Sequence, residues 1–143
     1  MMVKSAVVAA LWLVASAAAD PDAAPSVIVH APGDAVFSVS VVDGRPVLGP
    51  AKPAKLGAGA PQDGDILISV RPPGLAPYAT FTVVEKTAQP VDFVVTGLID
   101  TIKIDEVEVC GRLGAPIAGK IAAGARKLSL NRFNPQKEGA TCP

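Results

Sequence analysis

Residues 35–48 read AVFSVSVVDGRPVL, and this stretch decides the fold class. Phe37, Val39 and Val41 fall on one face of an extended chain and serines fall on the other, which predicts a half-buried β-strand. Asp43-Gly44 follows, and an Asp-Gly pair between β-prone segments is the strongest short signal for a tight hairpin. Pro46 has no amide hydrogen to donate, so the returning segment is predicted to be an edge strand.

Working outward, similar short segments predict further strands at residues 26–30, 65–71, 79–86, 91–99, 101–109 and 127–133. Segment 91–99 is apolar on both faces, which is typical of a strand in the middle of a packed structure. Segment 116–124 is ambiguous, because Ile117 and Ile121 suit one helical face while Gly119 and Gly124 disfavour a helix.

One predicted strand contains a change of phase. Ile102 and Ile104 lie on one face, whereas Val107 and Val109 lie on the other. A β-bulge near Asp105-Glu106 would restore the register. Alternatively, the two halves of the strand face different layers.

Seven or eight short strands separated by turns, with no convincing long helix, predict an all-β fold. We expect an antiparallel β-sandwich with immunoglobulin-like proportions, and a small β-barrel is the alternative. A net charge of zero and 50% hydrophobic residues exclude an intrinsically disordered chain. The Pro/Gly-rich segment 49–64 is predicted to be a long exposed loop within the domain.

The first nineteen residues have the features of a cleavable secretory signal. Lys4 supplies positive charge, residues 6–14 are apolar but too short to span a bilayer, and Ala17-Ala18-Ala19 fits the small-residue rule for cleavage. Cleavage would leave Asp20 as the N-terminus of a single domain over residues 20–143, in the periplasm or outside the cell. The alternative is a buried N-terminal helix.

The chain has two cysteines, Cys110 and Cys142, and in an exported protein two cysteines usually pair. The bond would close a loop of about 33 residues, worth roughly 3–4 kcal/mol of loop-closure entropy. Two free thiols are the alternative. A catalytic redox pair is disfavoured because the C-x-x-C spacing is absent.

Candidate chemistry is sparse. The densest acidic group lies in segment 100–108, and paired carboxylates can act as acid and base. A candidate cleft therefore combines His30, the sole histidine, with Asp105, Glu106 and Glu108. The interpretation that the sequence favours is a charged, bulged strand that resists edge-to-edge association. One histidine is too few for a copper or zinc site, so no metal or other cofactor is expected.

Cationic residues concentrate after Cys110, and they define a candidate cationic face for an anionic partner: Arg112, Lys120, Arg126, Lys127 and Arg132. These residues are not interleaved with aromatic residues, so nucleic-acid binding is not expected.

The leading functional hypothesis is a non-enzymatic exported binding or structural module whose partner is another envelope or extracellular protein. Three alternatives stay open: a small secreted hydrolase using the carboxylates of segment 100–108, an inhibitor that inserts the loop 49–64, and a subunit of a surface fibre.

Overall fold

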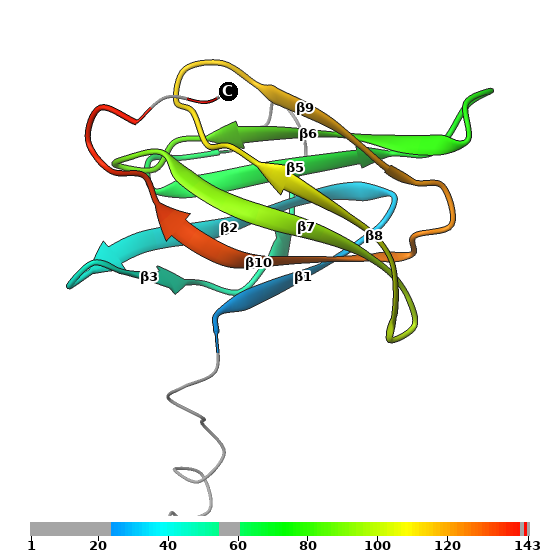
Figure 1. Cartoon of the computed structure of the whole chain (residues 1–143), viewed down its shortest axis with the longest axis horizontal. Coiled ribbons are helices and arrows are strands. Elements are labelled where there is room, and N and C mark those ends of the chain that lie inside the picture. The colour runs from blue at the N-terminus through cyan, green and yellow to red at the C-terminus, as the bar shows by residue number, and fades with distance from the viewer. Residues whose placement is uncertain (1–23, 55–60, 141, 143) are drawn as a thin grey trace, which may run out of the picture.

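The computed structural model describes residues 24–54, 61–140 and 142, and every regular element among them is a β-strand (Figure 1). The predicted signal at 1–19 and residues 55–60 of the predicted loop lie outside the described residues. The strands are β1 (Ser26–His30), β2 (Gly33–Val42), β3 (Arg45–Leu48), β4 (Lys52–Pro53), β5 (Asp65–Arg71), β6 (Tyr78–Glu85), β7 (Val91–Ile99), β8 (Ile102–Val109), β9 (Ile117–Ala122) and β10 (Lys127–Pro135).

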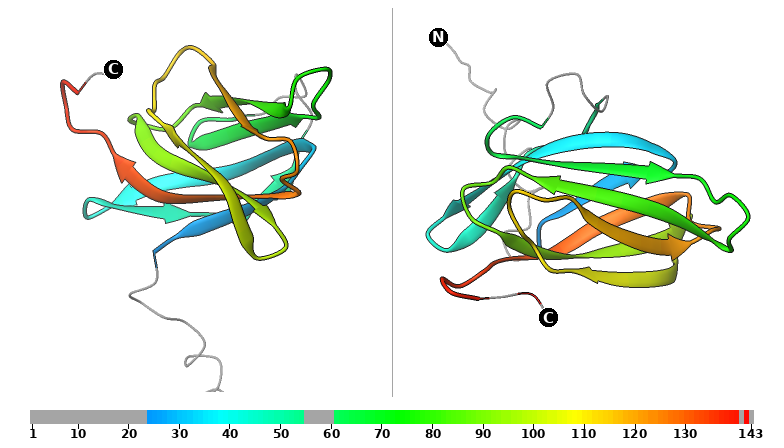
Figure 2. Two further views of the ribbon diagram at one scale, coloured as in Figure 1. Left: turned by 45° about the vertical axis from the view of Figure 1, so that its right-hand side comes forward. Right: turned by 90° about the horizontal axis from the view of Figure 1, so that it is seen from above.

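The strands form two antiparallel sheets, one of which curls into a half-barrel, and this arrangement agrees with a β-sandwich or a small barrel (Figure 2). One sheet has the order β1-β10-β7-β8, and the other has the order β3-β2-β5-β6-β9, with β4 also paired to β2. The chain crosses between the sheets at four connections: β1–β2, β6–β7, β8–β9 and β9–β10. No helix in the described residues is long and apolar enough to cross a membrane.

The hairpin predicted from residues 35–48 is confirmed. Val42 pairs with Arg45, and Asp43 and Gly44 between them have φ angles of 52° and 76°. Positive φ at both central residues is the geometry of a type I′ turn, whose twist matches that of the flanking strands. β3 pairs with β2 alone, so the strand containing Pro46 lies at the edge of its sheet, as predicted.

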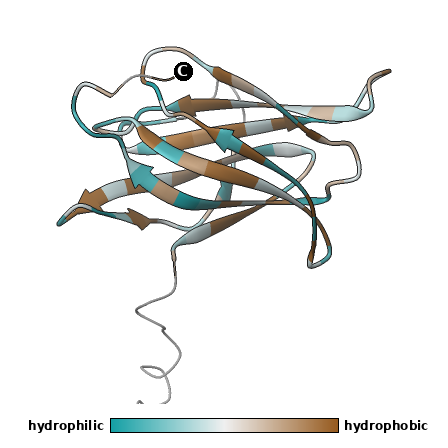
Figure 3. Ribbon diagram, in the orientation of Figure 1, coloured by the Kyte–Doolittle hydropathy of each residue, from teal (hydrophilic) through white to brown (hydrophobic). Residues whose placement is uncertain are grey.

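The core lies between the inward faces of the two sheets, and hydrophobic and hydrophilic residues alternate along the strands (Figure 3). Phe133 joins the sheets, because its ring stacks on Phe93 at a centroid distance of 5.2 Å and meets Phe37 edge-on at 5.9 Å. Gly119 leaves room for the Phe81 ring, which occupies the space that a β-carbon would need. β7, predicted to be central, is an interior strand between β10 and β8.

The predicted bulge in β8 is confirmed at Ile104. Gly97 pairs with Asp105 and Leu98 pairs with Lys103, so Ile104 is the extra residue. The bulge sends Val107 and Val109 to the core. It does not bury the isoleucines, because Ile102 is 65% exposed and Ile104 is 36% exposed.

The structure settles one ambiguous segment and corrects two predicted boundaries. The ambiguous segment 116–124 contains a strand, β9, because it pairs along β6. The predicted loop 49–64 contains the short strand β4, which pairs with Ala35 and Val36 of β2. β10 does not stop at Asn134-Pro135, because a register shift after Asn131 lets both residues pair with the start of β7.

The predicted disulfide between Cys110 and Cys142 is present, with a Cα–Cα distance of 5.7 Å. It joins the end of β8 to the C-terminal tail, which otherwise extends beyond the last strand.

Candidate functional site

Four connections meet at one end of the molecule, on the right-hand side in Figure 1. They are the β1–β2 connection (31–32), the β5–β6 loop (72–77), the β7–β8 turn (100–101) and the β9–β10 loop (123–126). Strand pairing places three of them together, because His30, Lys127, Leu98 and Lys103 lie in one row across four strands. The β5–β6 loop joins them, because Pro72 and Pro73 line one pocket with Pro32 and Arg126. We call this end the loop pole and the opposite end the far pole.

The loop pole exposes large apolar side chains. Eight large hydrophobic residues are exposed in the described part of the chain, and four of them belong to this pole: Leu75, Ile99, Ile102 and Ile104. Leu75 is fully exposed in a proline-rich loop, and Ile102 pairs with Ile99 at the end of the β7–β8 hairpin. The three isoleucines are grouped at the β7–β8 hairpin, and grouped apolar side chains mark an interaction surface more often than single ones do.

A small pocket of about 220 Å³ lies between the loops of this pole. Pro32, Pro72 and the loop 123–126 line it, and two cations, Arg71 and Arg126, stand at its wall. Arg71 donates a hydrogen bond of 2.8 Å to Asp34, so its charge is paired. Arg126 has no ion-pair partner in the described residues, and neither does the adjacent Lys127.

Charge differs between the two poles. The charge of the loop pole is counted over its four connections and the two strand residues on either side of each. This region contains four bases and two acids, apart from His30: Arg71, Lys103, Arg126, Lys127, Asp34 and Asp100. At the far pole, the β2–β3, β6–β7 and β8–β9 connections with the same flanks, together with residues 61–66, carry three bases (Arg45, Lys86, Arg112) and five acids (Asp43, Asp63, Asp65, Asp92, Glu108), apart from the buried Glu85. The described molecule is therefore polarised along its strands, with the cationic end at the loop pole.

The structure does not bring the candidate cleft together. His30 ends β1, one edge of its sheet, whereas the three acids lie on β8, the other edge, about 14 Å away across β10 and β7. Asp105 turns toward β9 and accepts a 2.8 Å hydrogen bond from the amide of Ala122. Glu106 accepts hydrogen bonds from Lys103 at 2.6 Å and Arg132 at 2.9 Å. The hydrogen bond from Lys103 is the main reason that the pKa of Glu106 is lowered.

The candidate cationic residues are also distributed over several surfaces. Arg132 lies on the outer face of the β1-β10-β7-β8 sheet beside Glu106, whereas Lys120 lies on β9 of the other sheet, with its ammonium 4.5 Å from the Tyr78 ring centroid. Arg112 belongs to the far pole and donates a hydrogen bond to the carbonyl of Pro116. Arg126 and Lys127 alone among the five stand at the loop pole.

The described part of the predicted loop 49–64 begins beside Ser38 in β2 and runs toward the loop pole. β4 pairs beside the first half of β2, and the amide of Ala54 donates a 3.1 Å hydrogen bond to the carbonyl of Asp34. The chain is described again at Pro61, which is buried, and it enters β5 at the far pole. The described N-terminal flank of the loop therefore ends beside Asp34, at the loop pole.

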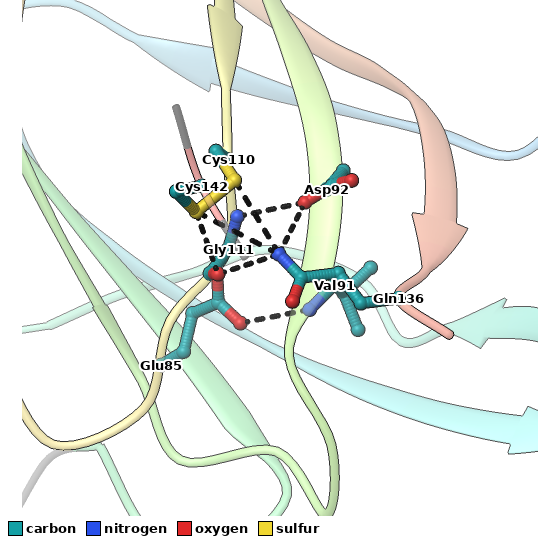
Figure 4. The surroundings of a disulfide bond; sticks show 7 residues. All are labelled: Glu85, Val91, Asp92, Cys110, Gly111, Gln136 and Cys142. Carbon is teal, nitrogen blue, oxygen red and sulfur yellow. Dashed lines mark hydrogen bonds between the residues drawn. A yellow bond between two sulfur atoms is a disulfide. The ribbon is translucent and has the colours of Figure 1, made fainter. Parts of the chain in front are cut away.

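A partly buried polar cluster lies at the far pole around the disulfide (Figure 4). Glu85 is 3% exposed, and its Oε2 accepts a 3.1 Å hydrogen bond from the amide of Val91, while Oε1 has no hydrogen-bond partner among the described residues. Burial, with a smaller contribution from the charge of Asp92, raises the pKa of Glu85 to about 7. Thr87 and Val91 also line a neighbouring groove of about 680 Å³, so Glu85 supports the wall of that groove from inside.

Asp92 holds the segment beside the disulfide. Its Oδ1 accepts a 2.9 Å hydrogen bond from the amide of Gly111 and a 2.7 Å hydrogen bond from Nε2 of Gln136. Gln136 Nε2 also donates to the carbonyl of Gly111 at 2.7 Å. A β-carbon at Gly111 would contact the backbone of Val91 and the carboxyl of Glu85, which is why this close packing requires glycine. The cluster joins β7, the end of β8 and the C-terminal tail.

Sequence reasoning missed Glu85 and the exposed residues of the loop pole. Glu85 was detectable, because it continues the inward alternation of Phe81 and Val83 on the same strand. Leu75 was detectable as a single large apolar residue in a Pro/Gly-rich loop. No local signal showed that Leu75 and Ile102, 27 positions apart in sequence, belong to one end of the molecule.

Within the described residues, no three histidine, cysteine or carboxylate side chains converge to hold a metal ion. No protein-family model matches the chain, and neither a curated protein nor a solved structure is significantly similar to it.

Proposed function

We propose that this chain is an exported, non-enzymatic binding module, a β-sandwich of immunoglobulin-like proportions that engages a component of the cell envelope or its surroundings through the loop pole. The observation that carries the proposal is the grouping of Leu75, Ile99, Ile102 and Ile104 at one end of the described sandwich. Leaving a large aliphatic side chain in water instead of burying it costs roughly 1.5–3 kcal/mol of hydrophobic stabilisation, so a partner that covers these residues gains free energy on binding.

Two further observations support this proposal. Binding residues commonly lie in loops held by a rigid scaffold, as at the loop end of immunoglobulin-like sandwiches. The Cys110–Cys142 disulfide is compatible with an oxidising compartment.

The test is site-specific photocrosslinking in cells that export the protein. A benzophenone amino acid at Leu75 or at Ile102 should give crosslinked adducts. The same residue at Val47, which is also half exposed but lies in the hairpin of the far pole, is the matched control. Adducts at Val47 equal to those at the pole positions, or no adducts at any position, would overturn the proposal.

A second experiment tests the non-enzymatic part. A general hydrolase screen should detect no activity in the purified protein. Activity that disappears when His30, Glu106 and Glu108 are together changed to glutamine would establish the alternative, a hydrolase, even though His30 lies on the opposite edge of the sheet from the two carboxylates.

A further inference from the structure

The apolar residues of the loop pole form two separate projections. One is the loop 72–77, PPGLAP, in which prolines restrict the backbone on both sides of the fully exposed Leu75. The other is the end of the β7–β8 hairpin, where Ile99 and Ile102 are cross-strand partners. The projections come from different sheets, and a pocket of about 220 Å³ lies at the base of the loop 72–77.

Cations stand directly behind these projections. Lys103 follows Ile102 in β8, and Lys127 is in the same cross-strand row. Arg126 and Arg71 line the pocket on the side of the proline-rich loop. Lysine and arginine side chains near an apolar tip can place their stems along apolar surface and their charged heads in a polar layer.

We propose that the occupant of the loop pole is an anionic lipid surface, an inference that rests on the proposed function and names the partner of that same site. Leu75 and the Ile99–Ile102 end of the hairpin enter the boundary between headgroups and acyl chains. Arg126 and Lys127, the two cations of this pole without an ion-pair partner in the described residues, contact the anionic headgroups. The polarity of the molecule supports this orientation, because the acid-rich far pole then faces away from the membrane.

The composition of the pole favours lipid over a folded protein partner. Cores of protein interfaces are enriched in aromatic residues and depleted in lysine, whereas the exposed large apolar residues here are aliphatic and two of the four cations are lysines. A protein partner needs a separate pocket for each projection. A bilayer interface accepts both projections without a separate pocket for each. Asp100, at the tip of the hairpin, is the residue that opposes this orientation.

The experiment is co-sedimentation of the protein, isolated in its naturally processed form, with vesicles of phosphatidylcholine alone or with about one third phosphatidylglycerol. Binding should require the anionic lipid and should weaken as salt rises. Leu75→Asp or Ile102→Asp should lower the partition coefficient at least tenfold, and Arg126→Gln should lower it about fivefold. Asp100→Asn should raise it, because it removes a negative charge from the inserted tip.

Val47→Asp is the matched control, since it adds the same charge at an exposed valine of the far pole and should leave binding unchanged. Any membrane affinity of the N-terminal region would be shared by every variant. Absence of binding to anionic vesicles, or equal binding by the Ile102→Asp and Val47→Asp variants, would overturn the inference. If the protein does not bind vesicles, but photoreactive residues at positions 75 and 102 crosslink to a protein, the lipid inference fails and the proposed function stands.

Discussion

At the scale of single residues, Glu85 is the side chain whose environment differs most from what its chemistry prefers. A carboxylate with one unpartnered oxygen is buried beside Gly111, with Asp92 nearby. Burial disfavours the charged form of a carboxyl group, because the protein interior solvates a charge less well than water does. Glu85 therefore stays protonated to a higher pH in the folded protein than in the unfolded chain.

This difference makes stability depend on pH. The pKa of Glu85 is about 7 in the folded protein and 4.5 without the fold. Protonated Glu85 contributes its full stabilisation below pH 4.5, the pKa of the group in the unfolded chain. This contribution declines as the pH rises toward about 7, its pKa in the folded protein. The free energy of unfolding should fall by up to about 3 kcal/mol between pH 4.5 and pH 7 from this group.

Glu85→Gln should remove most of that dependence, because glutamine stays neutral and its carbonyl can still accept the hydrogen bond of Val91. Urea denaturation at pH 5 and pH 8 should show the variant to be more stable than the native protein at pH 8 and similar to it at pH 5. Glu108→Gln, at an exposed carboxylate, is the control and should keep the native pH profile. The explanation is wrong if Glu85→Gln keeps that profile too.

At the scale of elements, the bulged strand β8 lies beside β9 of the other sheet but does not pair with it. β8 hydrogen-bonds only to β7, and β9 hydrogen-bonds only to β6, among the described strands. Asp105 connects them, since its carboxylate accepts hydrogen bonds of 2.8 Å from the amides of Glu106 and Ala122. The bulge at Ile104 directs this side chain toward β9, so the charged, bulged strand also has a structural role.

Asp105→Ala should destabilise the protein by about 2 kcal/mol, because two backbone amides lose their acceptor. Amide hydrogen exchange should accelerate at Ala122 and leave the interior strand β7 protected. Glu108→Ala, at an exposed acid of the same strand, should change stability by less than about 0.5 kcal/mol. Equal losses in the two variants would show that Asp105 does not link the sheets.

At the scale of the whole molecule, the disulfide and the Asp92–Gly111–Gln136 hydrogen bonds tie the C-terminal tail to the far pole and leave the loop pole free of the tail. One pole is covalently closed, and the other presents apolar residues and cations. This division matches a scaffold that is stabilised at one end and binds at the other.

Changing Cys110 and Cys142 together to serine should lower the free energy of unfolding by roughly 3–4 kcal/mol, the loop-closure contribution of the bond. Chemical denaturation with and without reductant measures this effect. Reduced native protein should match the double variant, and reductant should not alter the variant. If reduction leaves the stability of the native protein unchanged, the bond contributes nothing to the fold.

The sequence by itself determined the local features: the strand at 35–42, the type I′ turn at Asp43-Gly44, the edge position of Pro46, the bulge in β8 and the disulfide. These features follow from side-chain alternation, from backbone conformations that few residues tolerate, and from covalent chemistry, all of which act over a few positions or through a single bond.

Only the tertiary structure decided which strands became neighbours, and therefore what each surface contains. The pairing of β1 with β10 placed His30 far from the acids of β8, and the crossings between sheets brought Leu75 and Ile102 to one pole. Glu85 became an unusual carboxyl only because Val91 and Gly111 pack over it. Alternation along a strand specifies the face of each side chain, whereas its neighbours depend on packing between segments distant in the sequence.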